Sequence, residues 1–460
     1  MSKYKGKKIL VVGLGRSGLA VCKYLVKQGA RVTVTDLKQK HELKDAVKAL
    51  GDLKIEMDLG RHNPQLFIEA ELIIVSPGVP LNIKPLEDAR LKSIPITSEI
   101  EMAARLLKEP LIGVTGTNGK TTTTHLIREM FMADKKPIFA GGNIGTPLLE
   151  YFNGDEKVDY VVAELSSFQL ETIEKLVPAV AVFTNITPDH LDRYADMTSY
   201  ITAKKKLLTA AERNSYVVIN YDDTVVSQFA RDTQAKVLYF TKQNPLSIGG
   251  EFAERFQGAY FIPGSGQVIA KFSGKEESYE LKRLKIFGDH NKENLMAAIC
   301  AARALGVRPT AIQTVIDTFP GVEHRLEFVR KRDGVYFFND SKATNVNSVI
   351  KSLMAFKNSP IILIAGGKDK DGDFAPLAGL VKEKCKLLIL VGEAKEKINR
   401  AIGDYVETYL VGTFEEAVLL AYQKSRNGDI ILLSPGCASF DMFRNYEERG
   451  EYFKKLVMQI

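Results

Sequence analysis

Residues 111–124, Leu-Ile-Gly-Val-Thr-Gly-Thr-Asn-Gly-Lys-Thr-Thr-Thr-Thr, join a short apolar run to a glycine-rich loop. Apolar runs of this length suit strands that are buried on both faces, as in parallel sheets covered by helices. In the loop, consecutive backbone N–H groups can surround phosphate oxygens, Lys120 can reach the terminal phosphates, and Thr121 can hold Mg²⁺. The strict P-loop pattern has glycine where Val114 stands, so this loop is a variant with Gly116 inside it. The stretch predicts a phosphate-binding site, and a plain turn with a solvated lysine is the weaker alternative.

Similar apolar runs lie on both sides of this stretch and alternate with helical patterns. The runs occupy residues 9–12, 32–34, 72–75, 160–163, 180–183, 361–364, 387–391 and 430–433. Helical patterns separate them, for example at residues 18–28, 125–133 and 291–305, whereas residues 240–286 are more β-like and interrupted by glycine. This alternation of strand and helix predicts an α/β fold with mostly parallel sheets.

The chain length and two breaks in the pattern predict three domains. A chain of 460 residues is about three times as long as a typical domain. One helical pattern ends near residues 107–110, and another ends at the Pro-Gly turn at 320–321. We expect a Rossmann-like domain over 1–108, a central P-loop-type ATPase domain over 109–320 and a Rossmann-like C-terminal domain over 321–460.

The composition excludes several classes of protein. The chain is 45% hydrophobic and 26% charged, which is ordinary for a globular protein and unlike a disordered or fibrous one. Lys plus Arg is 63 and Asp plus Glu is 56, so the formal charge of +7 is a mild excess. Because basic residues form no stripe with interleaved aromatic residues, we expect no nucleic-acid partner.

We also expect neither a targeting segment nor a disulfide framework. The apolar run at 9–12 is cut by Gly13 and Arg16, and no later run approaches the roughly 20 residues of a membrane span. The cysteines are far apart in the sequence and show no zinc-ligand spacing: Cys22, Cys300, Cys385 and Cys437. These features predict a cytoplasmic protein with reduced thiols and no membrane segment.

A second glycine-rich loop, Gly-Leu-Gly-Arg-Ser-Gly at 13–18, follows the first apolar run, and Asp36 stands about 20 residues further on. In dinucleotide-binding folds, such glycines let the backbone approach a pyrophosphate, and the acidic residue holds a ribose. Alone, this pattern also fits an NAD(P)-dependent oxidoreductase. Two nucleotide-type loops in one chain instead suggest that ATP acts on a second, nucleotide-bearing substrate. A non-catalytic nucleotide sensor is the third class of function.

Candidate metal ligands follow two further apolar runs. Glu164 comes directly after the run at 160–163, and His190 follows the run at 180–183. Open α/β sheets place their ligands at the carboxyl ends of the strands. A carboxylate and an imidazole at that edge could share a hard cation with phosphate oxygens.

Nine motifs, in order along nearly the whole chain, carry a resemblance to a known family. They are Gly-Thr-Asn-Gly-Lys-Thr-Thr at 116–122, Gly-Asn-Ile-Gly at 142–145, Glu-Leu-Ser-Ser-Phe-Gln at 164–169, Asn-Ile-Thr-Pro-Asp-His-Leu-Asp at 185–192, Gly-Asp-His-Asn-Lys-Glu-Asn at 288–294, Glu-His-Arg at 323–325, Asn-Asp-Ser-Lys-Ala-Thr-Asn at 339–345, Gly-Gly at 366–367 and Leu-Ser-Pro-Gly-Cys-Ala-Ser-Phe-Asp at 433–441. With these motifs the chain resembles the ATP-dependent Mur ligases, which build the peptide stem of bacterial peptidoglycan. The motifs at 339–345 and 433–441 resemble those of the D-glutamate-adding members.

The resemblance implies an ATP-dependent amide ligase that joins D-glutamate to UDP-N-acetylmuramoyl-L-alanine in cytoplasmic peptidoglycan precursor synthesis. In this family ATP converts the substrate carboxylate to an acyl phosphate, which the amine of the incoming amino acid attacks. Anionic charge accumulates in both steps, so lysine, arginine and Mg²⁺ should dominate catalysis. The extra N-terminal domain disfavours a folylpolyglutamate synthase, which shares only the other two domains. We expect a monomer whose partners are these small molecules.

The resemblance also implies roles for residues at the ATP site. The predicted ATP-binding residues are Gly116, Thr117, Asn118, Gly119, Lys120, Thr121, Thr122, Asn291, Asn294, Arg325 and Asp340. The predicted metal ligands, for two Mg²⁺ ions, are Thr121, Glu164, His190 and Lys204. The predicted catalytic residues are Lys120, His190, Lys204 and Arg325.

Further residues would hold the substrates. Those for the uridine diphosphate group are Arg16, Ser17, Asp36, Ser76 and Gly78, and those for the muramoyl group are Asn143, Ser166 and Gln169. Those for D-glutamate are Thr344, Lys370, Ser439 and Tyr446, with Lys370 pairing a carboxylate. Leu37 stands where relatives can have a hydrogen-bonding residue, so the resemblance leaves the detailed contacts to uridine open.

Members of the family also carry a lysine carbamylated by CO₂, and the resemblance assigns it to Lys204. Neighbouring helix residues point about 100° apart, so at most one of the lysines at 204–206 can face the metal. Counting from His190 leaves Lys205 as the weaker alternative. Carbamylation requires a neutral amine, so a depressed lysine pKa is part of this hypothesis.

Overall fold

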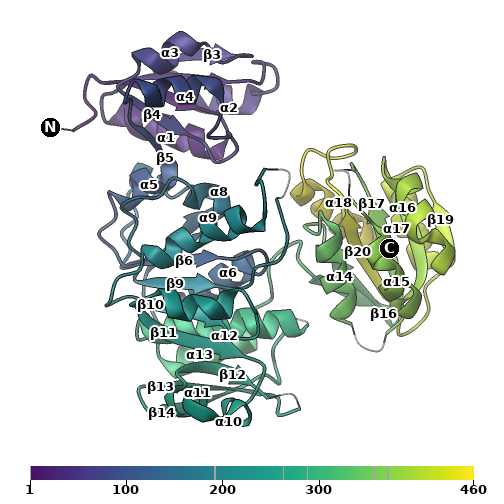
Figure 1. The fold of residues 1–460 in the computed structure, drawn as a ribbon. Helices are drawn as coiled ribbons and strands as arrows, with labels where there is room; N and C mark the ends of the chain where they lie inside the picture. The colour runs from purple at the N-terminus through teal and green to yellow at the C-terminus, as the bar shows by residue number, and fades with distance from the viewer. Residues whose placement is uncertain are drawn as a thin grey trace. The chain divides into compact units, whose positions relative to one another are not determined.

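The computed structural model describes residues 2–143, 145–190, 193–262, 264–286, 288–356, 359–369 and 372–460, which form three sheets flanked by helices (Figure 1). Their contacts divide them into two compact units. The first runs to residue 282 and takes up residues 293–315, and the second contains residues 283–292 and 316–460. The first unit holds a five-stranded and a nine-stranded sheet, and the second holds a six-stranded sheet. The predicted α/β class with mostly parallel sheets is confirmed.

The N-terminal sheet is entirely parallel. Its strands in spatial order are β3 (Ile55–Leu59), β2 (Arg31–Asp36), β1 (Lys8–Val12), β4 (Leu72–Val75) and β5 (Ile96–Ser98). Its helices are α1 (Arg16–Lys27), α2 (Lys44–Leu50), α3 (Pro64–Glu69), α4 (Lys84–Leu91) and α5 (Glu99–Ala104). Leu10 and Val12 belong to one hydrophobic cluster and Ile9 and Val11 to another, so β1 is buried on both faces. Chain order reverses between β1 and β4, where this class of fold binds ligands.

The central sheet places the P-loop strand between a neighbour that ends at Glu164 and a neighbour whose following loop carries His190. Its strands in spatial order are β14 (Lys275–Glu280), β13 (Gln267–Phe272), β12 (Gly258–Phe261), β11 (Lys236–Thr241), β10 (Tyr216–Asn220), β9 (Val180–Phe183), β6 (Leu111–Thr115), β8 (Tyr160–Glu164) and β7 (Ile138–Gly142). Strands β6 to β12 are parallel, and the hairpin strands β13 and β14 are antiparallel to their neighbours.

The helices of the central region lie between and around these strands. They are α6 (Lys120–Ala133), α7 (Glu150–Asn153), α8 (Ser167–Leu170), α9 (Met197–Thr209), η1 (Val226–Asp232), α10 (Pro245–Ile248), α11 (Gly250–Arg255), α12 (Asp289–Ala304) and α13 (Pro309–Thr318). Helix α6 begins directly after the P-loop, because Gly119 with φ of +85° turns the chain into the helix.

The C-terminal sheet is parallel except at one edge. Its strands in spatial order are β15 (Glu327–Arg332), β16 (Val335–Asn339), β20 (Ile430–Gly436), β17 (Ile361–Gly366), β18 (Cys385–Val391) and β19 (Thr408–Leu410), with β15 antiparallel. Its helices are α14 (Val346–Met354), η2 (Ala375–Leu377), α15 (Ala378–Lys384), α16 (Lys395–Ile402), η3 (Gly403–Tyr405), α17 (Phe414–Gln423) and α18 (Tyr446–Gln459). Ile361 and Leu363 pack into one hydrophobic cluster and Ile362 and Ile364 into the other, so β17 is also buried on both faces.

Helix α5 links the N-terminal sheet to the central sheet through two buried carboxylates. Glu99 Oε1 accepts a hydrogen bond from the Leu149 N–H at 2.7 Å, while its Oε2 is buried without a partner. Glu101 accepts from the N–H groups of Glu174 and Lys175 at 2.8–3.0 Å. Burial raises the pKa of Glu99 to about 7 against the opposing effect of the backbone N–H donors.

We expect Glu99→Gln to stabilise the protein at pH 8 and to change its stability much less at pH 5. Between the ordinary pKa of 4.5 and about 7, the folded chain holds a proton that the unfolded chain has released. Wild-type stability therefore falls as pH rises through this window, by at most about 3 kcal/mol, whereas the glutamine keeps the acceptor and does not ionise. Urea unfolding of both proteins at the two pH values measures the difference. An equal difference at both values would contradict the prediction.

Candidate active site

The P-loop requires glycine at two positions because other groups fill the space of a side chain. Gly116 has φ of +143°, and a Cβ there would lie 1.9 Å from Thr184 Oγ1. Gly119 has φ of +85°, and a Cβ there would lie 2.1 Å from Asn294 Oδ1. Asn294 therefore lies directly against the P-loop, where the resemblance assigns it to the ATP site. Asn291 is buried, and its N–H donates to the Gly288 carbonyl oxygen at 3.1 Å.

Two lysine ammonium groups meet at one carbonyl oxygen of this loop. Lys120 Nζ donates to the carbonyl oxygens of Gly116 at 3.0 Å and Thr117 at 2.9 Å. Lys204 Nζ, from helix α9, donates to the same Gly116 oxygen at 2.8 Å. The loop thus brings together two of the residues that the sequence singled out as catalytic.

Lys204 is almost completely buried, with 1% of its surface exposed. Burial lowers its pKa well below the ordinary value, and the charge of Lys120 lowers it further, against the opposing charges of Asp189 and Glu164. Lys205 instead pairs with Asp232 at 2.6 Å, and Lys206 donates to the Glu171 carbonyl oxygen at 2.5 Å. Of these three lysines, Lys204 is the one that reaches the P-loop.

Thr121, Glu164 and Asn143 form a chain of hydrogen bonds beside Lys120. Glu164 Oε2 accepts from Thr121 Oγ1 at 2.8 Å, and Oε1 accepts from Asn143 Nδ2 at 2.8 Å. Glu164 is 3% exposed, and the neighbouring Thr122 Oγ1 is buried without a partner. A carboxylate and hydroxyls are oxygen donors of the kind that Mg²⁺ prefers, so this set fits the ion.

His190 stands on the loop after β9 with a left-handed backbone, φ of +56°. Its side chain is 43% exposed, its Nε2 lies 3.8 Å from Asp189 Oδ2, and its ring meets the Phe168 ring edge-on at 4.8 Å. Phe168 belongs to helix α8, which follows β8 and Glu164. The contact brings together the loops after β8 and β9, as their positions in the sheet predict.

Residues 185–187, which the sequence marks only as part of a shared motif, support the P-loop. Asn185 Oδ1 accepts from the Asn118 N–H at 2.9 Å, and the Asn185 carbonyl oxygen accepts from the Thr117 N–H at 2.8 Å. The Thr117 hydroxyl lies 3.0 Å from the Tyr200 hydroxyl, one turn before Lys204. These bonds fix the loop from β9 and from α9, and only tertiary structure reveals them.

The first glycine-rich loop is held in shape by Asp36 and Ser76. Asp36 Oδ2 accepts from the Leu14 N–H at 2.7 Å, and its Oδ1 accepts from the Lys38 N–H at 2.9 Å. Ser76 Oγ donates to the Gly13 carbonyl oxygen at 3.0 Å, which joins the loop after β1 to the loop after β4. The other predicted residues there are Arg16 and Gly78, which are exposed, and Ser17, which is half-buried.

Ser166 and Gln169 bind each other at the start of helix α8. The Ser166 N–H and hydroxyl donate to Gln169 Oε1 at 3.0 and 3.1 Å, and Ser166 Oγ accepts from the Gln169 N–H at 3.3 Å. This reciprocal capping box orders the short helix directly after Glu164.

In the second unit, Asp340 is fully enclosed by hydrogen-bond donors. Its Oδ2 accepts from the hydroxyls of Ser352 and Ser434 at 2.5 and 2.9 Å, and its Oδ1 accepts from the Leu326 N–H at 3.2 Å. Burial raises the pKa of Asp340 to about 6. The Leu326 bond anchors the chain next to Arg325, whose Nε is buried without a partner. The structure therefore places Asp340 as a support for the segment that carries Arg325.

Three of the residues predicted for D-glutamate lie near the carboxyl ends of strands β16 and β20 or at the start of α18. Ser439 is buried, and Thr344 and Tyr446 are half-buried. The buried Arg449 donates to the carbonyl oxygens of Ser341, Cys437 and Ala438 at 2.8–3.3 Å, which ties the loops after these two strands together. The fourth residue, Lys370, lies outside the described residues.

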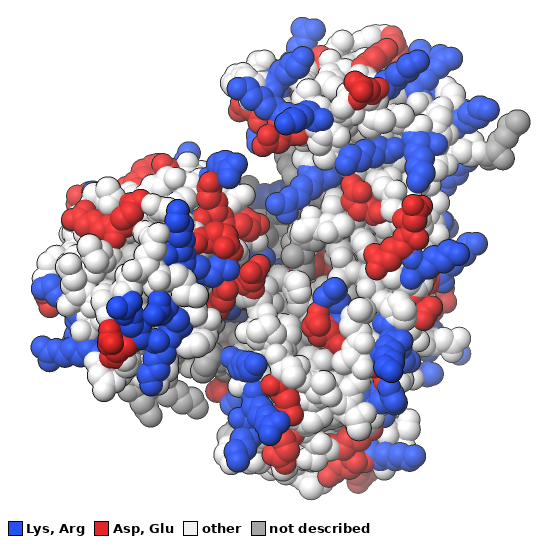
Figure 2. Space-filling model, turned by 180° about the vertical axis from the view of Figure 1, so that it is seen from behind, with Lys and Arg blue, Asp and Glu red and all other residues white. Residues whose placement is uncertain are grey.

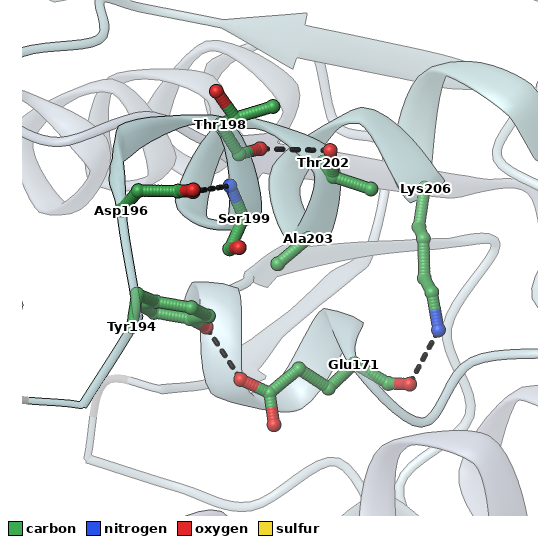
Figure 3. A pocket seen from close by; sticks show the side chains of 8 residues that line it. All are labelled: Glu171, Tyr194, Asp196, Thr198, Ser199, Thr202, Ala203 and Lys206. Carbon is green, nitrogen blue, oxygen red and sulfur yellow. Dashed lines mark hydrogen bonds between the residues drawn. The ribbon is translucent and has the colours of Figure 1, made fainter.

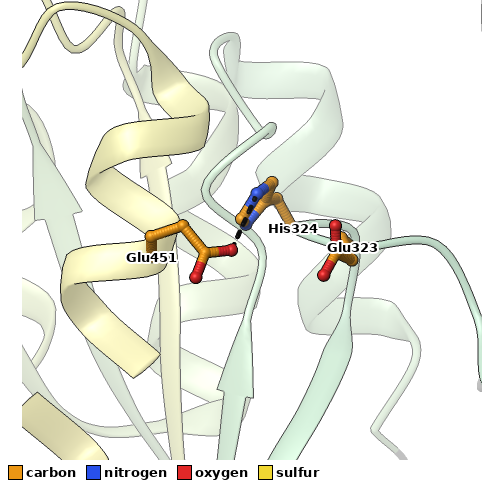
Figure 4. Close-up of side chains that lie close together, drawn as sticks. All are labelled: Glu323, His324 and Glu451. Atoms are coloured by element: carbon orange, nitrogen blue, oxygen red, sulfur yellow. Dashed lines mark ion pairs between the residues drawn. The ribbon is translucent and has the colours of Figure 1, made fainter. Parts of the chain in front are cut away.

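A cluster of possible metal ligands near Arg325 is paired with a lysine. Glu323, His324 and Glu451 each offer one ligand atom within 4.8 Å of the others (Figure 4). Lys454 Nζ lies 3.4 Å from Glu323 and 2.7 Å from Glu451, and it also pairs with Glu327 at 3.2 Å. The two carboxylates of this cluster thus belong to an ion-pair network around Lys454.

The mild excess of positive charge in the sequence gives no single basic patch on the described part of the face in Figure 2. Figure 2 shows basic and acidic side chains interspersed over both units on the face in view. Among the described residues, no helix is both long and apolar enough to cross a membrane. All four cysteines are buried, and burial raises the pKa of Cys437 to about 12, so this thiol stays protonated near neutral pH.

Family models match the chain in three consecutive parts. Residues 7–98 match the MurD-like N-terminal domain of Mur ligases, residues 114–302 the Mur ligase middle domain, and residues 324–437 the Mur ligase glutamate ligase domain. These matches correspond to the three sheets.

Similar proteins cover nearly the whole chain. A UDP-N-acetylmuramoylalanine--D-glutamate ligase of Bdellovibrio bacteriovorus is 47% identical, covering 99% of this chain and 98% of the relative. A ligase of the same name from Geotalea uraniireducens is 48% identical, with coverage of 99% and 98%. Among solved structures, a pseudomurein peptide ligase type C from Methanothermus fervidus has a TM-score of 0.61 at 22% identity, covering 99% of this chain and 100% of its own. The UDP-N-acetylmuramate-alanine ligase MurC from Thermotoga maritima also has a TM-score of 0.61, at 20% identity with coverage of 98% and 99%.

Proposed function

The chain belongs to the Mur ligase family, and from that membership we propose that it joins D-glutamate to UDP-N-acetylmuramoyl-L-alanine in an ATP-dependent reaction. The observation that carries the proposal is the pair of nucleotide-type loops within the first unit. One follows β1 and is shaped by Asp36 and Ser76, and the other follows β6 and carries Lys120. The first suits a nucleotide-bearing substrate, and the second suits ATP.

The reaction needs positive charge where phosphate is transferred. A carboxylate is a poor electrophile, and phosphorylation gives it a good leaving group before the amine attacks. Lys120 would leave the carbonyl oxygens of its own loop and bind the transferred phosphoryl group, which carries anionic charge in the transition state. Arg325, with its unpartnered Nε, would provide further positive charge toward ATP, and Asp340 would hold its segment.

Members of the family use ATP and Mg²⁺. In this chain Thr121, Glu164 and His190 would hold the ion, which supplies electrostatic stabilisation of the phosphate oxygens. Asn143 would then bind the muramoyl substrate from the position where it now donates to Glu164. Ser166 and Gln169 would shape the adjoining part of the same site.

A carbamate on Lys204 is part of the proposal, with a second Mg²⁺ bound to the new carboxylate. Two observations support it: the ammonium group is buried, and it shares a carbonyl oxygen with Lys120. Both conditions favour the neutral amine that reacts with CO₂. For D-glutamate we propose Thr344, Ser439, Tyr446 and Lys370, and for the enzyme as a whole a cytoplasmic monomer.

Phosphate release by the purified chain tests the proposed reaction. The assay contains ATP, Mg²⁺, UDP-N-acetylmuramoyl-L-alanine and one amino acid at a time from a panel of D- and L-forms. We expect phosphate with D-glutamate and none with L-glutamate or without the UDP substrate. Release with a different amino acid would assign the chain to another member of the family. Tight NAD binding without ATP binding would favour the oxidoreductase alternative.

A further inference from the structure

Arg193 connects the two parts of the first unit at the point where their candidate ligand loops meet. Its Nη1 donates to the Pro77 carbonyl oxygen at 2.9 Å, and its Nη2 donates to the Val79 carbonyl oxygen at 3.3 Å. Both carbonyls belong to the loop after β4, where Ser76 contacts the first glycine-rich loop. The backbone N–H of Arg193 donates to the His190 carbonyl oxygen at 3.0 Å. One residue thus bonds to the nucleotide-substrate loop and to the loop of a candidate metal ligand.

The guanidinium of Arg193 also contacts the side chains of Phe168 and Glu171. It lies 4.0 Å from the centre of the Phe168 ring, and its Nη2 is 3.5 Å from Glu171 Oε2. The Tyr194 hydroxyl donates to Glu171 Oε1 at 2.5 Å, and Lys206 donates to the Glu171 carbonyl oxygen at 2.5 Å. Figure 3 shows Glu171 between these two donors. Glu171 also lines a pocket of about 370 Å³. Glu171 is therefore a rigid anchor for the arginine.

Phe168 also contacts the imidazole of His190. The Phe168 ring that carries the guanidinium on its face also meets the His190 ring edge-on at 4.8 Å. His190 has φ of +56°, a conformation that a histidine keeps only when its surroundings hold it. The backbone bond from Arg193 and the ring contact with Phe168 are two such restraints. A displacement of the loop after β4 would change both through the guanidinium.

We propose that Arg193 is a positioning residue that couples occupancy of the loop at residues 76–79 to the placement of His190. The proposal rests on the proposed function, because that function puts the uridine diphosphate group at this loop. Binding of the remote uridine diphosphate group would hold Pro77 and Val79 in place. Through its hydrogen bonds to these residues and to His190, Arg193 would then hold His190 in its position. Binding free energy from a non-reacting part of the substrate then lowers the barrier of the reaction, so kcat as well as KM depends on it.

Two substrates and four proteins test the coupling. The full substrate is UDP-N-acetylmuramoyl-L-alanine, and the truncated one is 1-phospho-N-acetylmuramoyl-L-alanine, which lacks the uridine monophosphate part. In the wild type we expect kcat to be about 10-fold higher with the full substrate. In Arg193→Ala, kcat with the full substrate should fall about 10-fold, while kcat with the truncated substrate should stay within about threefold. Arg193→Lys should behave like the alanine variant, because an ammonium cannot bond two carbonyls and stack on a ring together.

The matched control is Arg105→Ala. Arg105 also joins the two parts of the first unit, through Glu174 at 2.9 Å, and within the described part of the chain its hydrogen bonds go to Glu101 and Glu174 rather than to either ligand loop. We expect it to preserve the wild-type ratio of the two kcat values. An equal fall with both substrates in Arg193→Ala, or equal kcat values with both substrates in the wild type, would overturn the coupling. A wild type that does not ligate D-glutamate at all contradicts the proposed function instead.

Discussion

Lys120→Ala is expected to lower kcat for ligation about a thousandfold and to leave the fold intact. The ammonium group lies on the P-loop within hydrogen-bond distance of two of the loop's own carbonyl oxygens. The Gly116 oxygen keeps its hydrogen bond from Lys204 when the Lys120 side chain is removed, so little stability is lost. The transferred phosphoryl group, in contrast, loses a fixed positive charge in a partly buried site, where such a charge contributes most. Steady-state phosphate release with D-glutamate measures the loss.

A lysine outside the site serves as the control for Lys120. Lys136 Nζ donates to the Leu305 carbonyl oxygen at 3.3 Å, beyond the end of helix α6. Lys136→Ala should keep kcat within about twofold, because a partly exposed lysine away from the site contributes little to stability and nothing to the transferred phosphoryl group. Circular dichroism of all three proteins should coincide. If Lys120→Ala retains a tenth or more of wild-type kcat, the loop lysine does not stabilise the transferred group.

The fold was predictable from the sequence because its central strands are buried on both faces. Runs such as Ile9–Val12 and Ile361–Ile364 have no polar position, and in the structure their alternate residues enter separate hydrophobic clusters. The β-like stretch at 240–286 contains the hairpin strands that extend the central sheet. The N-terminal and central sheets form one compact unit, in which buried groups such as Glu99 and Glu101 bind across the two sheets.

The site residues were predictable from the sequence where they stand at or just after the end of a strand. Lys120, Thr121 and Glu164 each stand within a few residues of a strand end, so the sheet itself brings them together. Arg193 could not be found in this way, because its partners Pro77 and Val79 are more than a hundred residues away and offer only backbone carbonyls. For Asp36, the sequence predicts a role that its contacts in the structure do not show. Its residue type suggests a ribose ligand, whereas its oxygens accept from Leu14 and Lys38.

The sequence left open which lysine of helix α9 would carry the proposed carbamate, and burial separates the two candidates. Lys204 is 1% exposed and bonds to the P-loop, whereas Lys205 pairs with Asp232 at 2.6 Å. We expect Lys204→Ala to lower kcat at least about a hundredfold, because the site loses a carboxylate and the metal charge bound to it. Lys205→Ala should retain kcat within about threefold, since surface ion pairs contribute little.

Chemical rescue distinguishes a carbamate on Lys204 from a simple lysine. The carbamate carries a negative charge where the lysine carries a positive one, so Lys204→Ala removes an anion if the group is modified. Acetate or formate can then enter the space left by the side chain and restore part of the activity, whereas a small amine should not. Carbon NMR of wild type with labelled bicarbonate should show a carbamate signal that Lys204→Ala lacks and Lys205→Ala keeps. Rescue by the amine alone would mean that the ammonium acts unmodified, and its charge beside Lys120 would then serve the phosphate directly.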